Sequence, residues 1–193
     1  TMFANAGVQV KPVFLKKIED KNGIIIYNQK PEYKDILSEE INYVMLRLLQ
    51  GVVDKGTALR LRGSKNKNKN SKGDNYQTLN NIGYEFTNQI AGKTGTTDNH
   101  SDGWFIGLVP DLVTGVWVGG EERSIHFRSI KLGSGANMAL PIWGEFMKNI
   151  YNDSEFSDNY NHSFDKPNKE LSINLDCKIE NNDNSNIFDE SFD

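Results

Sequence analysis

Residues 89–120 read QIAGKTGTTDNHSDGWFIGLVPDLVTGVWVGG. Three short apolar runs lie in this stretch, at residues 89–92, 103–109 and 112–118. Aromatic and β-branched residues dominate the last two runs, and Pro110-Asp111 separates them. Because proline pre-sets a turn and such runs suit a pleated, half-buried surface, the stretch predicts a strand followed by a β-hairpin.

The segment KTGTT, residues 93–97, stands ahead of that hairpin. In an extended strand Lys93 and Gly95 share one face, and Thr94 and Thr96 share the other. Two hydroxyls at this spacing can donate to one carboxylate, and the neighbouring ammonium favours an anionic ligand. Gly95 has no Cβ, so a substrate can approach the strand closely, and the Thr96 N–H can form half of an oxyanion hole. The pattern therefore predicts a binding site for an anionic substrate, with the donors that acyl transfer requires.

Length and composition set the limits of the prediction. The chain has 193 residues, enough for one ordinary domain with a core. Residues 152–193 hold eleven of its 26 acidic and three of its 22 basic residues, so a mildly basic body precedes an acidic tail. One cysteine, Cys177, and three scattered histidines make neither a disulfide nor a metal-ligand cluster, so we expect no metal site. No apolar run approaches the roughly 20 residues that span a bilayer.

The N-terminal third predicts a hairpin and then a helix. Residues 8–17 alternate like a strand, and the turn Asp20-Lys21-Asn22-Gly23 leads into a second strand at 24–27. Ser38 can cap the helix, which Gly56 ends. Seven apolar residues at helical spacing predict its buried face: Ile41, Val44, Met45, Leu48, Leu49, Val52 and Val53.

Two segments are expected to lie outside the core. Residues 60–75 read RLRGSKNKNKNSKGDN and predict a flexible Lys/Asn-rich surface loop in which nothing is buried. Nucleic-acid binding is not expected there, because no aromatic residues interleave with the lysines. The acidic, Asn-rich tail at 152–193 is expected to be disordered.

After the central hairpin, residues 121–130 predict a further strand and residues 136–151 a final helix that Pro141 bends or interrupts. Its apolar face is predicted to be Ile142, Trp143, Phe146, Met147 and Ile150. The aromatic residues Trp104, Phe105, Trp117 and Trp143 are interpreted as core residues, and Trp104 is also a candidate for lining a substrate cleft. Asp102 is expected to close the polar turn, and His100 to lie on the surface.

Several segments together resemble the C-terminal part of the transpeptidase domain of class A penicillin-binding proteins, the bifunctional peptidoglycan synthases. They are TMFANAGVQVKPVFLKKIEDKNG near the start, LLQGVVDKGTA at the end of the predicted helix, AGKTGTT, DGWFIGLVPDLVTGVWVGG and ALPIWGEFM. They occur in the family's order across residues 1–151. The resemblance implies an α+β fold, an antiparallel sheet flanked by helices, of which this chain supplies a part.

The resemblance also implies roles for the KTG strand. Thr94 and Thr96 would hold the carboxylate of a peptidoglycan stem peptide or a β-lactam, beside Gly95 and Trp104. Lys93 would support proton relay, and the Thr96 N–H would complete the oxyanion hole. The implied reaction is acyl transfer on a D-Ala-D-Ala peptide without metal or cofactor. The longer protein would be anchored in the cytoplasmic membrane, with this domain on its extracytoplasmic face.

The family's first two motifs, S-x-x-K and S-x-N, are expected upstream of this chain, in the other half of the domain. Literal matches occur at Ser64–Lys67, Ser64–Asn66, Ser157–Asn159 and Ser163–Lys166. They fall in the predicted loop and tail, and a solvated loop cannot hold a nucleophile beside its base. We therefore expect no turnover from the isolated chain. The alternative is a catalytically inert fragment or a subdomain that only packs against the missing half. A P-loop is excluded because Thr87 stands where the motif requires glycine.

Overall fold

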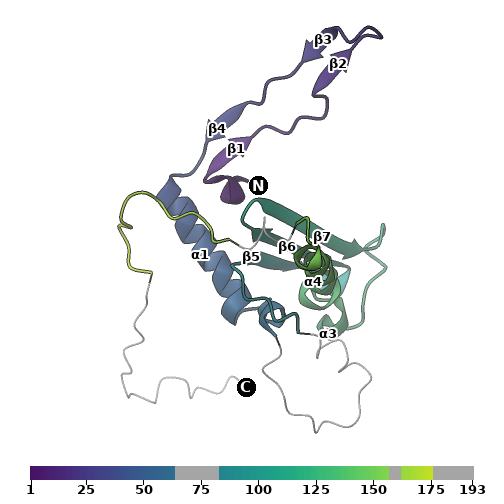
Figure 1. Ribbon diagram of the computed structural model, residues 1–193. Coiled ribbons are helices and arrows are strands. Elements are labelled where there is room, and N and C mark those ends of the chain that lie inside the picture. The colour runs from purple at the N-terminus through teal and green to yellow at the C-terminus, as the bar shows by residue number, and fades with distance from the viewer. Residues whose placement is uncertain (64–82, 157–161, 176–193) are drawn as a thin grey trace, which may run out of the picture.

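The computed structural model describes residues 1–63, 83–156 and 162–175. Helices pack around a three-stranded antiparallel sheet, and two smaller two-stranded sheets form an arm near the N-terminus (Figure 1). This confirms the predicted α+β class. In chain order the elements are η1 (Met2–Asn5), β1 (Val8–Val10), β2 (Lys17–Glu19), β3 (Ile25–Asn28), β4 (Tyr33–Asp35), α1 (Glu39–Lys55), η2 (Leu59–Arg62), β5 (Ala91–Thr96), η3 (Asp98–His100), β6 (Asp102–Val109), β7 (Leu112–Gly119), α3 (Ile130–Gly133) and α4 (Gly135–Asn152).

The central sheet is formed by residues 91–119, within the stretch predicted to form a strand and a hairpin. Its strand order is β5-β6-β7, so β5 is an edge strand in the part of the chain that the structure describes. The hairpin β6–β7 closes on Val109 opposite Leu112, which leaves Pro110 and Asp111 as a two-residue turn. Proline fixes φ near −65° at the first position, and Asp111 has φ 64° at the second, the signs of a type II turn. The predicted strand and hairpin are confirmed.

Helix α1 begins and ends where predicted, but its buried face is rotated. Ser38 Oγ accepts the Ile41 N–H at 3.3 Å. Four side chains are buried: Asn42, Leu46, Gln50 and Val53. Ile41 and Leu48 of the predicted stripe are 53% and 61% exposed. The spacing of apolar residues did not predict this face because two of its buried residues are polar. Asn42 is one of them, and its side chain donates to the Phe3 carbonyl at 3.0 Å.

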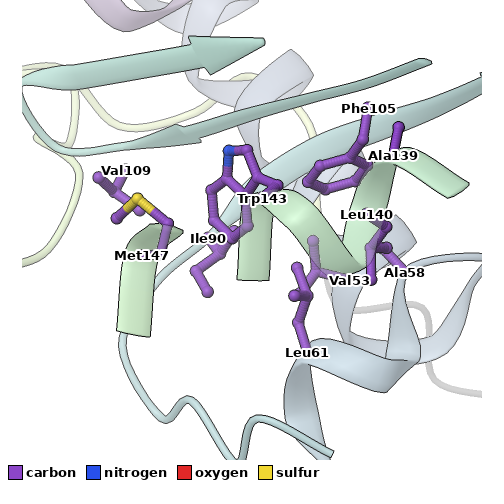
Figure 2. Close-up of a cluster of buried hydrophobic side chains, with 10 residues drawn as sticks. All are labelled: Val53, Ala58, Leu61, Ile90, Phe105, Val109, Ala139, Leu140, Trp143 and Met147. Atoms are coloured by element: carbon purple, nitrogen blue, oxygen red, sulfur yellow. The ribbon is translucent and has the colours of Figure 1, made fainter. Parts of the chain in front are cut away.

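Helix α4 covers the sheet and supplies the centre of the core. It lies across β6 and β7 and runs through Pro141 without ending. The Trp143 ring is fully buried and meets Phe105 edge-to-face at 5.2 Å between centroids (Figure 2). Ile142 and Phe146 of the predicted face are exposed, because α4 buries only the side that faces the sheet. The core cluster consists of Val53, Ala58, Leu61, Ile90, Phe105, Val109, Ala139, Leu140, Trp143 and Met147.

The N-terminal arm is a nested pair of hairpins. Strands β2 and β3 pair across the turn at Asp20, which confirms the predicted turn and the strand after it. The predicted first strand at 8–17 is wrong, because residues 11–16 form no strand and the partner of β3 is Lys17–Glu19. The inner pair joins β1 to β4, a strand that the sequence did not predict. Figure 1 shows the arm extending away from the central sheet. Strand β4 was not predicted because it is only three residues long and pairs with β1, which lies more than 20 residues earlier in the chain.

Three further expectations are wrong. Residues 121–129 form turns and bends where a strand was predicted, and α3 begins at Ile130. Trp104 and Trp117 are 44% and 48% exposed and pack against each other on the outer face of the sheet, so they are not core residues. The expectation that nothing in the loop at 60–75 is buried is wrong at its beginning, because Leu61 is fully buried in η2. Residues 64–75 of that loop lie outside the described residues.

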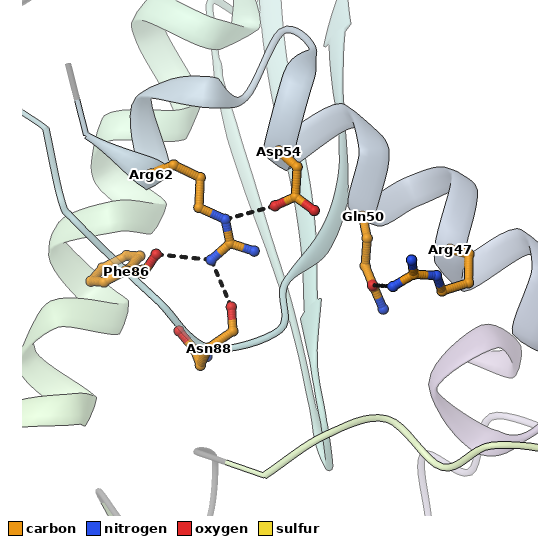
Figure 3. Close-up of polar contacts among 6 residues, drawn as sticks. All are labelled: Arg47, Gln50, Asp54, Arg62, Phe86 and Asn88. Atoms are coloured by element: carbon orange, nitrogen blue, oxygen red, sulfur yellow. Dashed lines mark hydrogen bonds and ion pairs between the residues drawn. The ribbon is translucent and has the colours of Figure 1, made fainter. Parts of the chain in front are cut away.

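Arg62 ties η2 to two neighbouring segments (Figure 3). Its Nε forms an ion pair with Asp54 Oδ1 at 2.8 Å. Its Nη1 donates to the Phe86 and Asn88 carbonyls at 2.9 and 2.6 Å. One guanidinium thus fixes the end of α1 against the chain that enters β5, which is the geometry for which arginine is suited.

We expect Arg62→Ala to lower the free energy of unfolding of this chain by about 1–3 kcal/mol, because two carbonyls and a carboxylate lose their donor together. Denaturant unfolding measures the change. The matched control is Arg123→Ala, which removes an exposed arginine from the turns that follow β7 and should cost under about 0.5 kcal/mol. Equal effects of the two substitutions would contradict this role of Arg62.

The tail was predicted to be disordered from residue 152, and this is wrong for residues 162–175, here called the strap. The strap returns across α1 and the start of β5. Phe164 is 7% exposed and packs on Leu46, Ala91 and Leu108, and its N–H donates to Gln89 Oε1 at 3.0 Å. Farther along, the Ser172 amide and hydroxyl both donate to Glu40, which lowers the pKa of that carboxyl. Residues 157–161 and 176–193 lie outside the described residues.

We expect Phe164→Ala to destabilise the chain by about 2–4 kcal/mol, because it removes a buried ring from the small apolar cluster that Phe164 forms with Leu46, Ala91 and Leu108. Thermal and denaturant unfolding provide the measurement. Phe156→Ala, at a ring that is 41% exposed in the same tail, is the control and should cost under about 1 kcal/mol. An unchanged midpoint for Phe164→Ala would mean that the strap does not hold the fold together.

Candidate active site

The site lies on the open edge of β5. Register pairs Gly95 with Trp104 and Thr96 with Gly103, so side chains alternate as predicted, with Lys93 and Gly95 on one face and Thr94 and Thr96 on the other. The Thr97 N–H donates to the Asp102 carbonyl at 3.1 Å, toward β6. Backbone groups of successive residues point to opposite sides of a strand, so the N–H groups of Thr94 and Thr96 point away from β6.

Lys93 reaches the same edge. Its side chain is exposed, and its Nζ donates to the Thr94 carbonyl at 2.8 Å. Because that carbonyl points away from β6, the ammonium bends over the open edge of β5, where the Thr96 N–H also points. The edge therefore presents a cation and a backbone donor on the same side of the strand.

Two contacts fix the threonine hydroxyls. Thr94 Oγ1 lies 2.8 Å from Thr57 Oγ1, in the turn that follows α1. Thr96 Oγ1 accepts the Gly135 N–H at 3.0 Å, at the start of α4. Neither Thr57 nor Gly135 was predicted to take part in the site. The only sequence signal for Thr57 was its place in the segment LLQGVVDKGTA, and periodicity does not show that this segment packs against β5.

Gly95 and Trp104 lie opposite each other at the mouth of the site. A Cβ on Gly95 would lie 3.1 Å from the Trp104 Cβ, so glycine leaves the space that this pairing needs. The Trp104 ring is tilted against Trp117, with 6.2 Å between centroids. The exposed aromatic surface beside Gly95 is consistent with the predicted substrate contact, which stays a prediction.

The polar turn between β5 and β6 is held by Asp102, as expected. Its Oδ2 accepts from Ser101 Oγ at 3.0 Å, and its Oδ1 accepts from Trp117 Nε1 at 3.1 Å. Thr97 Oγ1 accepts the Asp102 N–H at 2.9 Å. His100 is only partly exposed and its Nδ1 is buried, so the expectation of a surface histidine is only partly met. This network supports the end of β5 rather than lining its open edge.

The literal nucleophile motifs do not converge on β5 where the structure describes them. Ser163 and Lys166 lie in the strap, outside any helix or strand, and within the described residues no hydrogen bond joins them. The neighbouring Phe164 packs on Ala91, at the other end of β5 from Thr96. The matches at Ser64 and Ser157 lie outside the described residues.

Neither a metal centre nor a membrane span emerges from the part of the chain that the structure describes. Over residues 1–63, 83–156 and 162–175, no three side chains among His, Cys, Asp and Glu come together as metal ligands. In those same ranges every helix is too short or too polar to cross a membrane.

Comparison of the sequence with known protein families identifies the family of this chain. The family described as "Penicillin binding protein transpeptidase domain" matches residues 1–120. The chain belongs to this family.

Individual proteins similar to this chain are also penicillin-binding proteins. The chain is 34% identical over 177 residues to Penicillin-binding protein 1A of Aquifex aeolicus, covering 92% of this chain and 20% of that protein. It is 30% identical to Penicillin-binding protein 1A of Rickettsia prowazekii, covering 79% of this chain and 19% of that protein. The chain thus spans about a fifth of the length of these curated relatives.

A solved structure shows the same fold. The crystal structure of Penicillin-Binding Protein 1A from Haemophilus influenzae superposes with a TM-score of 0.58 and 19% identity, covering 89% of this chain and 26% of that one. At this identity the likeness concerns the fold alone.

Proposed function

We propose that this chain supplies the KTG strand and its supporting helices to a serine D,D-transpeptidase that crosslinks peptidoglycan and is acylated by β-lactams. The observation that carries the proposal is the open edge of β5. It presents the Lys93 ammonium, the outward Thr96 N–H, and the hydroxyls of Thr94 and Thr96 within four consecutive residues.

The proposed reaction is acyl transfer in two steps. A serine hydroxyl attacks the carbonyl of the D-Ala-D-Ala bond, its proton passes through the relay to the leaving amine, and D-Ala departs. An amine of a second stem peptide then attacks the acyl-serine ester, forms the new amide, and returns a proton to the serine. A β-lactam replaces the first substrate, and its ring-opened product stays on the serine.

Each group on β5 has a role in this proposal. The Thr96 N–H is one of two donors to the oxyanion that forms on the attacked carbonyl, and one such donor contributes about 10²–10³ in rate. The hydroxyls of Thr94 and Thr96 donate hydrogen bonds to the substrate carboxylate. Lys93 raises the positive potential that favours this anion, and it supports proton transfer. Gly95 has no Cβ and so leaves space for an extended peptide to lie along the open edge of β5, and Trp104 lines the surface beside it.

The serine, its lysine partner and the second motif would come from another part of a longer protein. That protein would be anchored in the cytoplasmic membrane, with this domain on the extracytoplasmic face. Its partners would be peptidoglycan stem peptides and β-lactams, and the other half of the domain would pack against this chain.

Intact mass after incubation with a penicillin tests the proposal, with this chain and a full-length penicillin-binding protein that contains it measured side by side. We expect one adduct on the full-length protein, mapping outside these 193 residues, and none on the chain alone. An adduct on the isolated chain would place a working serine inside it. Absence of labelling on both folded proteins would refute the transpeptidase assignment and favour a packing subdomain without its own activity.

A further inference from the structure

The two hydroxyls of the KTG strand each contact a group that belongs to a different helix. We infer that Thr57 and the Gly135 amide are positioning groups, which aim the hydroxyl protons of Thr94 and Thr96 at the substrate carboxylate. This inference rests on the proposed function and names the residues that prepare its anion site.

The geometry at Thr96 decides where its proton can go. A threonine hydroxyl carries one proton and two lone pairs. The Gly135 N–H occupies one lone pair at 3.0 Å, and an amide N–H cannot accept the hydroxyl proton in return. Thr96 therefore keeps its O–H free to donate to a ligand.

The pair Thr57–Thr94 leads to the same result once an anion is bound. At 2.8 Å either hydroxyl can donate to the other. A carboxylate only accepts, so it takes the single proton of Thr94. Thr57 must then donate to Thr94 Oγ1, and this chain of two hydrogen bonds polarises the Thr94 O–H toward the anion.

Both positioning groups are held by rigid surroundings. Thr57 lies between Gly56 and the fully buried Ala58, and the amides of these two residues both donate to the Val52 carbonyl. On the other side, Arg60 donates to the Ala136 carbonyl at 3.3 Å and to Asn137 Oδ1 at 3.1 Å. The turn after α1 and the first turn of α4 therefore place their donors against β5 before a ligand arrives.

The test uses a full-length penicillin-binding protein that contains this chain. Its second-order acylation rate is measured with benzylpenicillin and with the methyl ester of benzylpenicillin, which lacks the anionic carboxylate. Thr57→Val keeps the shape and removes the hydroxyl, Thr57→Ser keeps the hydroxyl, and Thr57→Ala gives a second deletion if the valine variant does not fold. Thr114→Val on β7 is the control for the loss of a threonine hydroxyl far from the site.

We expect Thr57→Val and Thr57→Ala to slow acylation by benzylpenicillin about tenfold, while the rate with the methyl ester stays within about twofold of wild type. Thr57→Ser and Thr114→Val should behave like wild type with both compounds. Equal slowing with both compounds, or no slowing with either, would overturn the inference. A wild-type protein that neither compound acylates would instead refute the proposed function.

Discussion

Lys93→Ala should lower the rate of acylation by a penicillin about 10²–10⁴-fold in a full-length protein that contains this chain. The side chain supplies the cation at the open edge of β5, where its Nζ donates to the Thr94 carbonyl at 2.8 Å. Its loss removes both the positive potential that favours the anionic ligand and the support for proton transfer, and acid–base groups typically contribute rate factors of this size. The measurement is stopped-flow or mass-resolved acylation at several penicillin concentrations.

Two controls make this result specific. Lys148→Ala removes an exposed lysine from α4, away from β5, and should leave the acylation rate unchanged. The unfolding midpoint of Lys93→Ala should also stay near that of the wild type, because an exposed side chain with one surface hydrogen bond contributes little to stability. A wild-type acylation rate in Lys93→Ala would refute the assigned role of this lysine.

The local elements could be predicted because their signals are local. Ser38 and Gly56 mark the ends of α1 through capping chemistry, and Pro110-Asp111 marks the hairpin through turn chemistry. The alternation along residues 93–96 follows from strand geometry alone, and for this reason the arrangement of the KTG side chains was predicted correctly.

The remaining features depend on contacts between segments distant in the sequence. Thr57 meets Thr94 at a separation of 37 residues, and Phe164 meets Gln89 at 75. Composition suggested disorder for the tail because large apolar residues are few. The strap nevertheless docks, because Phe164 enters an apolar cluster and hydrogen bonds to Gln89 and Glu40 add to that contact. The buried face of α1 was missed for a related reason, since Asn42 is buried with its own hydrogen-bond partner.

Gly135→Ala should impair both stability and acylation. A Cβ at this position would collide with the carbonyl oxygens of Gly95 and Trp104, which belong to paired strands and cannot turn aside. The start of α4 must then move away from the sheet, and the Gly135–Thr96 hydrogen bond of 3.0 Å is lost. We expect a loss of about 1–3 kcal/mol in the free energy of unfolding, as for other overpacked sites, and at least a tenfold slower acylation in the full-length protein.

Gly51→Ala is the matched control because it makes the same chemical change on α1, where a Cβ would meet nothing within 4 Å. It should stabilise the protein by about 0.5–1 kcal/mol, since alanine favours a helix interior over glycine, and should leave acylation unchanged. Opposite signs of the two stability changes would separate the collision at β5 from a general effect of replacing glycine. If Gly135→Ala also stabilised the protein and kept wild-type acylation, α4 would not be held against the KTG strand, and the positioning of Thr96 would need another explanation.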